Sequence, residues 1–137
     1  MSHAGGCLCK TVRFTVTAEP MASRVCWCRL CQYLGAGSGT VNLAFPSNAL
    51  AVTGDVRWHG AVADSGNSLQ RGFCPSCGAA LFSKADSRPH LIFIRAGAMD
   101  DPNLLAPQVT IWAKEAPTWA CIDPYLPQFD GQPPPVG

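Results

Sequence analysis

Cys74-Pro75-Ser76-Cys77-Gly78 has the form of a zinc knuckle and lies just past the middle of the chain. Two residues between the cysteines allow both sulfurs to face one ion, and the glycine that follows can adopt the positive φ that such a tight turn requires. Backbone N–H groups of the turn can then donate hydrogen bonds to the sulfurs. A structural zinc ion usually has four ligands, so this motif predicts half of a metal site.

Cys7 and Cys9 are the cysteines that best complete this site. Seven of the 8 cysteines fall into three clusters, and Cys7-Leu8-Cys9 is the remaining pair of matching count. Joining it to the knuckle closes a loop of about 65 residues, and a cross-link of that size contributes roughly 4 kcal/mol to stability. Zinc bound to thiolates can contribute on the order of 10 kcal/mol, against a typical total of about 5–15 kcal/mol. We therefore expect a structural zinc ion on Cys7, Cys9, Cys74 and Cys77.

The third cluster, Cys26-Trp27-Cys28-Arg29-Leu30-Cys31, has three cysteines within six residues and can bind a metal by itself. Three protein ligands leave the fourth position for water or substrate, which is the usual arrangement of a reactive zinc ion. We expect a second, more open zinc ion on Cys26, Cys28 and Cys31, with partial occupancy because it is easily lost. Disulfides, an iron–sulfur cluster, or a second structural metal closed by a histidine or a partner residue are the alternatives.

The other candidate metal ligands, one cysteine and three histidines, lie outside the three cysteine clusters. Cys121 is expected to be a small buried hydrophobic residue. His3 falls in a predicted N-terminal tail, and His59 and His90 lie near predicted strand ends. Each histidine is expected to be a surface or packing residue.

Composition narrows the class of protein. The chain has 137 residues, of which 47% are hydrophobic and 14% charged, with a formal net charge of +1. This predicts one domain over residues 1–137, with a core over about residues 5–129 and a proline-rich C-terminal tail. The sequence has no run of Lys or Arg, no apolar stretch long enough to cross a membrane and no export signal. We expect a cytoplasmic protein without a nucleic-acid or membrane partner, in which thiols stay reduced.

Alternation of apolar and polar residues predicts a mainly β fold, and no helical periodicity extends beyond about two turns. Residues 26–39 are expected to form a loop with at most a short helical turn. Gly54-Asp55 favours a tight turn between two strands, and Asp100-Asp101-Pro102-Asn103 favours the start of one helical turn. The predicted strands are Thr11–Val16, Thr40–Phe45, Leu50–Thr53, Val56–Ala61, Leu69–Phe73, Ala80–Lys84, Leu91–Ala96 and Val109–Ala113.

Three motifs in this order resemble the glutathione-dependent formaldehyde-activating enzyme family. They are Gly6-Cys7-Leu8-Cys9 before a Val-x-Phe strand, the C-x-C-x-x-C of the central cluster, and Arg71-Gly72-Phe73 leading into the knuckle. The resemblance continues through Ile111–Lys114, Pro117–Trp119 and Leu126–Phe129, so it spans roughly Gly5 to Phe129.

The resemblance implies a fold of the Mss4-like (β-tent) type, built from packed antiparallel sheets around a four-cysteine zinc site. It implies that Cys7, Cys9, Cys74 and Cys77 bind the structural zinc ion, and that Cys26, Cys28 and Cys31 bind the zinc ion linked to activity. The family's reaction joins glutathione to formaldehyde to give S-hydroxymethylglutathione, a carbon–sulfur lyase activity. A small thiol such as glutathione is therefore the expected partner.

Two residues beside the open zinc site depart from the family pattern. Family members commonly have a small or polar residue where this chain has Trp27, and a basic residue where it has Gln32. Trp27 either covers the site or forms a pocket wall, and Gln32 either orients a ligand or satisfies loop backbone; both are candidate substrate-binding residues. Candidate anchors for the carboxylates of glutathione are Arg24, Arg29 and Arg71.

The motifs and the family resemblance together support two possible functions. The first is a zinc-dependent enzyme acting on a thiol–aldehyde adduct, although no spacing identifies its general acid or base. The alternative is a non-catalytic, zinc-stabilised protein-binding module. A closed second metal site and a sizeable exposed apolar patch would favour the module.

Overall fold

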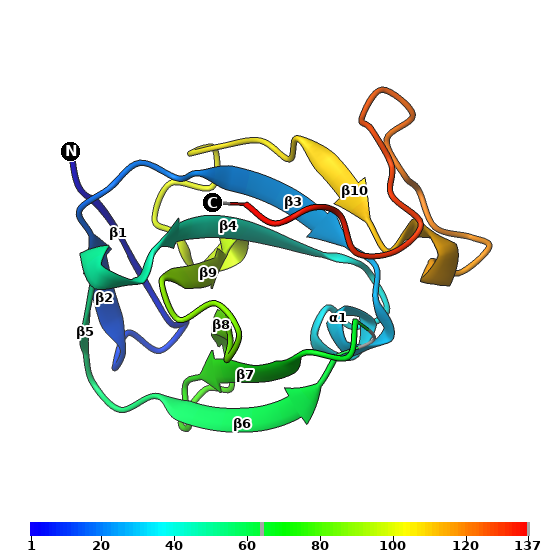
Figure 1. Ribbon diagram of the computed structural model, residues 1–137. Coiled ribbons are helices and arrows are strands. Elements are labelled where there is room, and N and C mark those ends of the chain that lie inside the picture. The colour runs from blue at the N-terminus through cyan, green and yellow to red at the C-terminus, as the bar shows by residue number, and fades with distance from the viewer. Residues whose placement is uncertain (64, 137) are drawn as a thin grey trace.

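The computed structural model describes residues 1–63 and 65–136, and β-strands dominate it, as predicted (Figure 1). A three-stranded sheet has the order β1-β2-β5 and a seven-stranded sheet the order β10-β3-β4-β9-β8-β7-β6. Every strand pair is antiparallel except β10 with β3.

The strands of the small sheet are β1 (His3–Gly6), β2 (Arg13–Val16) and β5 (Leu50–Thr53). Those of the large sheet are β3 (Ala22–Cys26), β4 (Thr40–Pro46), β6 (Arg57–Val62), β7 (Ser68–Phe73), β8 (Ala80–Ala85), β9 (Leu91–Arg95) and β10 (Val109–Ile111).

The described residues also form four short helical segments, three between strands and one after β10. One is an α-helix, α1 (Arg29–Leu34), which is longer than the single turn expected in this region. The others are 3-10 turns: η1 (Ser47–Ala49), η2 (Ala96–Ala98) and η3 (Ala113–Glu115). In Figure 1 the large sheet curls from β10 and β3 at the top to β6 at the bottom, with the small sheet at one side and α1 at the other.

The main core lies between the two sheets. Phe14 and Val16 point inward from β2 and are buried with Leu43 of β4 and Ile94 of β9. The Phe14 ring also meets Phe82 of β8 edge to face, with centroids 5.2 Å apart. Burying each such side chain stabilises the fold by about 1.5–3 kcal/mol. The predicted packing of sheet on sheet therefore rests mainly on hydrophobic contact.

The opposite face of the large sheet carries a polar row. Arg24 of β3 lies opposite Asn42 of β4, and Asn42 lies opposite Arg95 of β9. Residues directly opposite on neighbouring strands share one face, whereas their sequence neighbours point to the other. Leu43 and Ile94 consequently face the core, and the row faces away from the small sheet.

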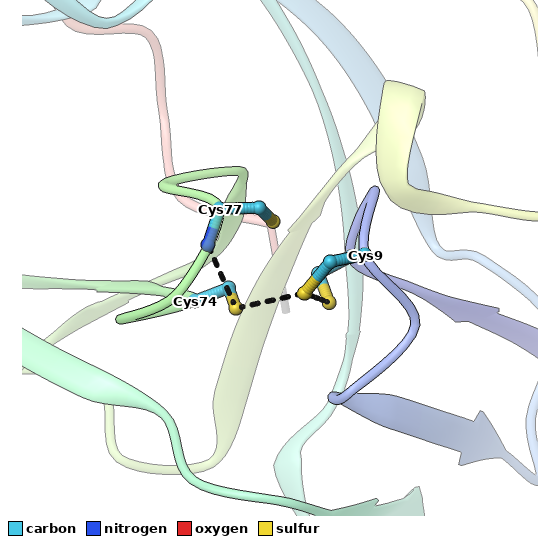
Figure 2. A group of neighbouring side chains, drawn as sticks. Cys9, Cys74 and Cys77 are labelled. Atoms are coloured by element: carbon cyan, nitrogen blue, oxygen red, sulfur yellow. Dashed lines mark hydrogen bonds between the residues drawn. The ribbon is translucent and has the colours of Figure 1, made fainter.

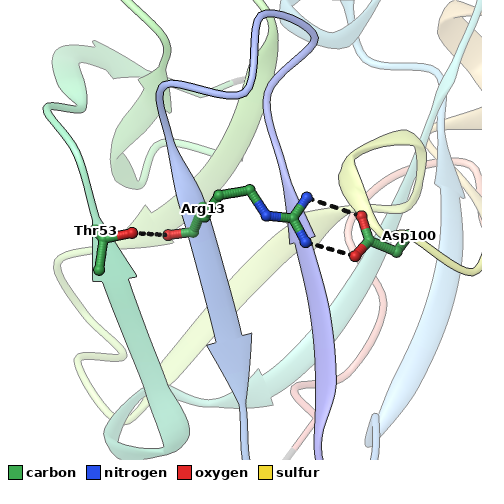
Figure 3. A network of polar contacts seen from close by, with 3 residues as sticks. All are labelled: Arg13, Thr53 and Asp100. Carbon is green, nitrogen blue, oxygen red and sulfur yellow. Dashed lines mark hydrogen bonds and ion pairs between the residues drawn. The ribbon is translucent and has the colours of Figure 1, made fainter.

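Arg13, the first residue of the central strand β2, links this strand to β5 and to a loop (Figure 3). Its carbonyl oxygen accepts a hydrogen bond of 3.3 Å from Thr53 Oγ1 in β5. Its guanidinium pairs with both carboxylate oxygens of Asp100, which follows η2, and Nη1 lies 2.9 Å from Oδ1. The contact links segments that lie 87 positions apart in the sequence.

Strands β1 and β3 were not predicted. The residues of β1 include Gly5 and Gly6, which give no alternating pattern. The structure explains Gly5, because a Cβ there would lie 2.2 Å from Ala98 O and 2.4 Å from Phe14 Cζ. The prediction that His3 lies in a tail is wrong: it begins β1, and its Nε2 lies 2.9 Å from Glu19 Oε2.

Two local predictions are also wrong. Gly54 does not form a hairpin turn, because β5 pairs with β2 while β6 pairs with β7, so the chain passes there from one sheet to the other. Its φ of +93° and the 2.2 Å between its ideal Cβ and Thr11 O require glycine at this crossing. Asp101 does not begin a helix, because its Oδ1 accepts a bond of 2.9 Å from Asn103 N and closes a turn.

The proline-rich tail is more ordered than the sequence indicated. Phe129 N donates to Thr110 O at 2.9 Å, and Thr110 N donates to Pro127 O at 3.0 Å. The tail thus runs beside β10 through a parallel bridge between Thr110 and Gln128. Gly137, the last residue of the predicted tail, lies outside the described residues. Over the described ranges, the structure has no helix with the length and apolar character needed to cross a membrane.

Candidate metal centres

The four-cysteine group forms where two tight turns meet. Cys7 and Cys9 lie in the turn between β1 and β2, and Cys74 and Cys77 lie in the turn between β7 and β8. All four Sγ atoms are within 4.8 Å of one another. Figure 2 shows Cys9 from one turn facing Cys74 from the other.

The spacing of these sulfurs fits one zinc ion. Tetrahedral coordination with a Zn–S distance of about 2.3 Å places sulfurs about 3.8 Å apart. The Sγ atoms of Cys7 and Cys9 are 3.6 Å apart, and those of Cys9 and Cys74 are 3.7 Å apart. The group therefore has the donor type and the geometry of a closed tetrahedral site.

The turns support the sulfurs as the knuckle motif predicts. Ser76 N and Cys77 N lie 3.4 Å and 3.5 Å from Cys74 Sγ, and Val12 N lies 3.3 Å from Cys7 Sγ. Gly78 has a φ of +76°, which confirms the role predicted for this glycine. These N–H groups would spread the negative charge of metal-bound thiolates.

Thr11 is a supporting residue that the sequence did not reveal. Its Oγ1 lies 3.1 Å from Cys9 Sγ and 3.5 Å from Cys74 Sγ, so one hydroxyl contacts both halves of the group. Hydrogen bonding from Thr11, joined by the Cys77 and Ser76 N–H groups, lowers the pKa of Cys74 to about 5. A threonine two positions after the second cysteine is the signal that could have identified it.

The three-cysteine group lies at the junction of β3 and α1. Cys26 ends β3, Cys28 is the N-cap of α1 and accepts a bond of 3.5 Å from Cys31 N, and all three residues are buried. Their Sγ atoms are within 4.8 Å of one another, and no fourth His, Cys, Asp or Glu of the described chain joins them. Hydrogen bonds from Cys26 and Cys28 lower the pKa of Cys31 to about 3, so one thiolate is favoured before any metal binds.

A cavity of about 120 Å³ opens beside these three sulfurs. The polar row of the large sheet lines it, with Phe93 on the same face. Asn42 Oδ1 accepts a hydrogen bond from Arg95 Nη1, which holds that guanidinium in place. Burial lowers the pKa of Arg95, and the sulfur of Cys31 partly offsets this. Sequence reasoning missed both Asn42 and Arg95.

Neither of the two candidate substrate residues, Trp27 and Gln32, lines the cavity. Trp27 is buried and packs against Gly39, whose ideal Cβ would lie 3.0 Å from the indole. Gln32 is also buried: its Nε2 donates to Trp27 O and Glu115 O, each at 2.8 Å, and its Oε1 accepts from Arg29 Nη1 at 2.6 Å. Gln32 therefore satisfies backbone carbonyls, and Trp27 is a packing residue.

The three proposed carboxylate anchors separate in space. Arg24 lines the cavity, whereas Arg29 lies over the ring of Tyr33 and Arg71 over that of Phe73. The prediction that Cys121 is buried is wrong, because it lies exposed in the irregular segment after η3. No histidine belongs to either cysteine group of the described chain.

Comparison with known proteins agrees with this architecture. The family model described as glutathione-dependent formaldehyde-activating enzyme matches residues 2–115. A crystal structure of a Rhodobacter sphaeroides protein, a structural genomics target, is similar in fold, with a TM-score of 0.57 and 18% identity over 73% of this chain and 92% of that one. No curated protein matches the sequence. The chain therefore belongs to the glutathione-dependent formaldehyde-activating enzyme family.

Proposed function

We propose that the protein is a zinc-dependent enzyme of the carbon–sulfur lyase type that forms and cleaves the adduct of a thiol and an aldehyde. The model reaction is glutathione plus formaldehyde giving S-hydroxymethylglutathione. In this proposal Cys7, Cys9, Cys74 and Cys77 hold a structural zinc ion, and Cys26, Cys28 and Cys31 hold the zinc ion at which the thiol binds.

The observation that supports this proposal best is the contrast between the two groups. Four sulfurs converge at the first, which leaves no position for another ligand on a tetrahedral ion. Three buried sulfurs converge at the second, and a cavity opens beside them. A ligand from solution could complete the second site without displacing any cysteine.

The reaction needs a nucleophilic sulfur held beside an aldehyde. A zinc ion on the three cysteines would keep an incoming thiol deprotonated, as coordinated thiols generally are. The sulfur lone pair then forms a bond to the aldehyde carbon, the π pair of the C=O bond moves to oxygen, and that oxygen takes up a proton. The thiol loses one proton and the product gains one, so the addition is balanced, and its reversal is the lyase direction.

The open second site also bears on the alternative function. A zinc-stabilised binding module would be favoured by a second metal site closed within the protein. The described residues supply only three ligands there, and these lie next to a cavity. This arrangement supports the enzyme over the module.

The direct test follows hemithioacetal exchange between formaldehyde and each of several thiols, glutathione among them, by NMR in the presence of the zinc-loaded protein. We expect exchange faster than in buffer, and the acceleration should be lost in Cys28→Ser. Cys121→Ser is the matched control, because this exposed cysteine belongs to neither group and its removal should leave the rate unchanged. No acceleration over buffer with any of several thiols would contradict the proposal.

A further inference from the structure

The cavity beside the three-cysteine group is rich in positive charge. Arg24, Arg88 and Arg95 all line it, and no His, Asp or Glu of the described chain does. Burial lowers the pKa of Arg24, and the nearby positive charge of Arg88 lowers it further. Like charges brought together disfavour the charged forms, and an anion bound beside them would offset this cost.

Two of these arginines are buried without full hydrogen bonding. Arg24 is 6% exposed and Arg95 is 8% exposed. Arg24 Nη2 and Arg95 Nε have no hydrogen-bond partner within the described ranges. None of the three cavity arginines forms an ion pair with a carboxylate of the described chain. Burying such groups unpaired is costly, which favours a ligand that pairs with them.

The charges of the described lining residues favour a ligand with two negative charges. Three thiolates around a zinc ion leave one net negative charge, while the three guanidinium groups bring three positive charges. One thiolate and one carboxylate together would neutralise the charges that the described lining residues and the zinc ion bring. Arginine is also the side chain best suited to a carboxylate, because its planar fork can donate two parallel hydrogen bonds.

The size of the cavity restricts the ligand further. Its volume of about 120 Å³ lies below the roughly 300–1,000 Å³ of pockets that enclose drug-sized molecules. Arg24 precedes Cys26 by two residues on β3, so the two side chains stand on one face about 7 Å apart along the strand. A sulfur and a carboxylate separated by a few bonds span this distance.

We propose that Arg24, with Arg88 and Arg95, forms a carboxylate subsite beside the three-cysteine zinc site, and that the thiol substrate is a short thiol acid. This deepens the proposed function and rests on it for the position of the sulfur. Asn42 is a positioning residue in this subsite, since it holds the Arg95 guanidinium.

The test measures binding by calorimetry on the reduced, zinc-loaded protein. The probes are 3-mercaptopropionate, which has both groups, 2-mercaptoethanol, which has only the thiol, and propionate, which has only the carboxylate. We expect 3-mercaptopropionate to bind about tenfold more tightly than 2-mercaptoethanol, because it adds a charge-assisted pair. Arg24→Met should abolish this advantage and Arg24→Lys should keep part of it. The exposed Arg57→Met is the matched control and should keep all of it.

Arg24→Met also tests the alternative that Arg24 only supports the fold. Because Arg24 Nη2 has no partner in the described chain, its replacement should leave the unliganded protein at least as stable as before. If Arg24→Met does not fold, Arg88→Met, which alters a less buried residue, must show the same loss of preference.

The outcomes separate this proposal from the proposed function. Equal binding of the two thiols, or a preference that survives both Arg24→Met and Arg88→Met, would overturn the carboxylate subsite while leaving the thiol site intact. Propionate binding that depends on Arg24, without any binding of 2-mercaptoethanol, would support the subsite and remove the thiol chemistry.

Discussion

Thr11 places one hydroxyl against sulfurs from both turns of the four-cysteine group. Such supporting contacts typically change metal affinity by about 10–100-fold. Thr11→Val keeps the shape of the side chain and removes the hydroxyl, so we expect the structural zinc ion to bind roughly tenfold more weakly in a competition with a chelator. Thr15→Val, at an exposed position of β2, is the control. Equal affinity in the two variants would show that the hydroxyl does not support the metal.

Gln32 joins α1 to the three-cysteine loop through a buried hydrogen bond and to η3 through a part-buried one. Gln32→Met fills a similar volume but leaves the carbonyls of Trp27 and Glu115 without this donor. A buried carbonyl that loses its donor costs about 1–3 kcal/mol and a part-buried one costs less, so we expect the free energy of unfolding in urea to fall by about 2–4 kcal/mol. Gln128→Met alters an exposed glutamine and should have little effect. If the two variants unfold alike, Gln32 does not stabilise this junction.

Residues of the site differed in how well the sequence predicted them. The cysteines were found because short fixed spacings encode a metal site locally. Arg95 and Asn42 were not, because the cavity forms only when the register of three strands places them beside Arg24. No local sequence pattern encodes the pairing register of these three strands.

At the scale of elements, the pair of Arg13 and Asp100 links β2 to the segment after η2 (Figure 3). The hydrogen bond from Arg13 lowers the pKa of Asp100. A carboxyl with a lowered folded-state pKa stabilises the fold above its unfolded pKa of about 3.9, and this contribution is lost as the pH falls through the folded value. Asp100→Asn should therefore lower Tm slightly at neutral pH, because the pair is exposed.

The pH dependence makes this prediction specific. The difference in Tm between the native protein and Asp100→Asn should be constant above about pH 5 and narrow at lower pH. Asp86→Asn, at an exposed carboxylate, serves as the control for acid effects on the metal sites. A difference that persists undiminished in acid would contradict a role for the ionised pair.

Elements with clear alternation were predicted, and elements shaped by tertiary contact were not. Residues of β2 and β9 alternate or form apolar runs, so the sequence indicated them directly. Strand β1 contains glycines that are needed for close approach to Phe14 and Ala98, and the crossing at Gly54 depends on the position of Thr11. These contacts involve residues distant in the sequence, which local periodicity does not report.

For the whole molecule, the two cysteine groups should differ in what bound zinc contributes to folding. The four-cysteine group joins turns about 65 residues apart, and zinc bound there can contribute on the order of 10 kcal/mol. A chelator added stepwise to the reduced protein should first remove one zinc ion with the far-ultraviolet circular dichroism unchanged. Removal of the second should unfold the chain, since a domain's whole stability is about 5–15 kcal/mol. Loss of the fold with the first ion would contradict this order.

We propose that seven cysteines build two zinc centres of unequal coordination. Metal analysis of the reduced, folded protein, combined with X-ray absorption at the zinc edge, tests it most directly. We predict two zinc ions per chain, one with four protein sulfurs and one with three, and in Cys28→Ser a single ion with four sulfurs. A reduced and folded chain that carries no zinc would contradict the account.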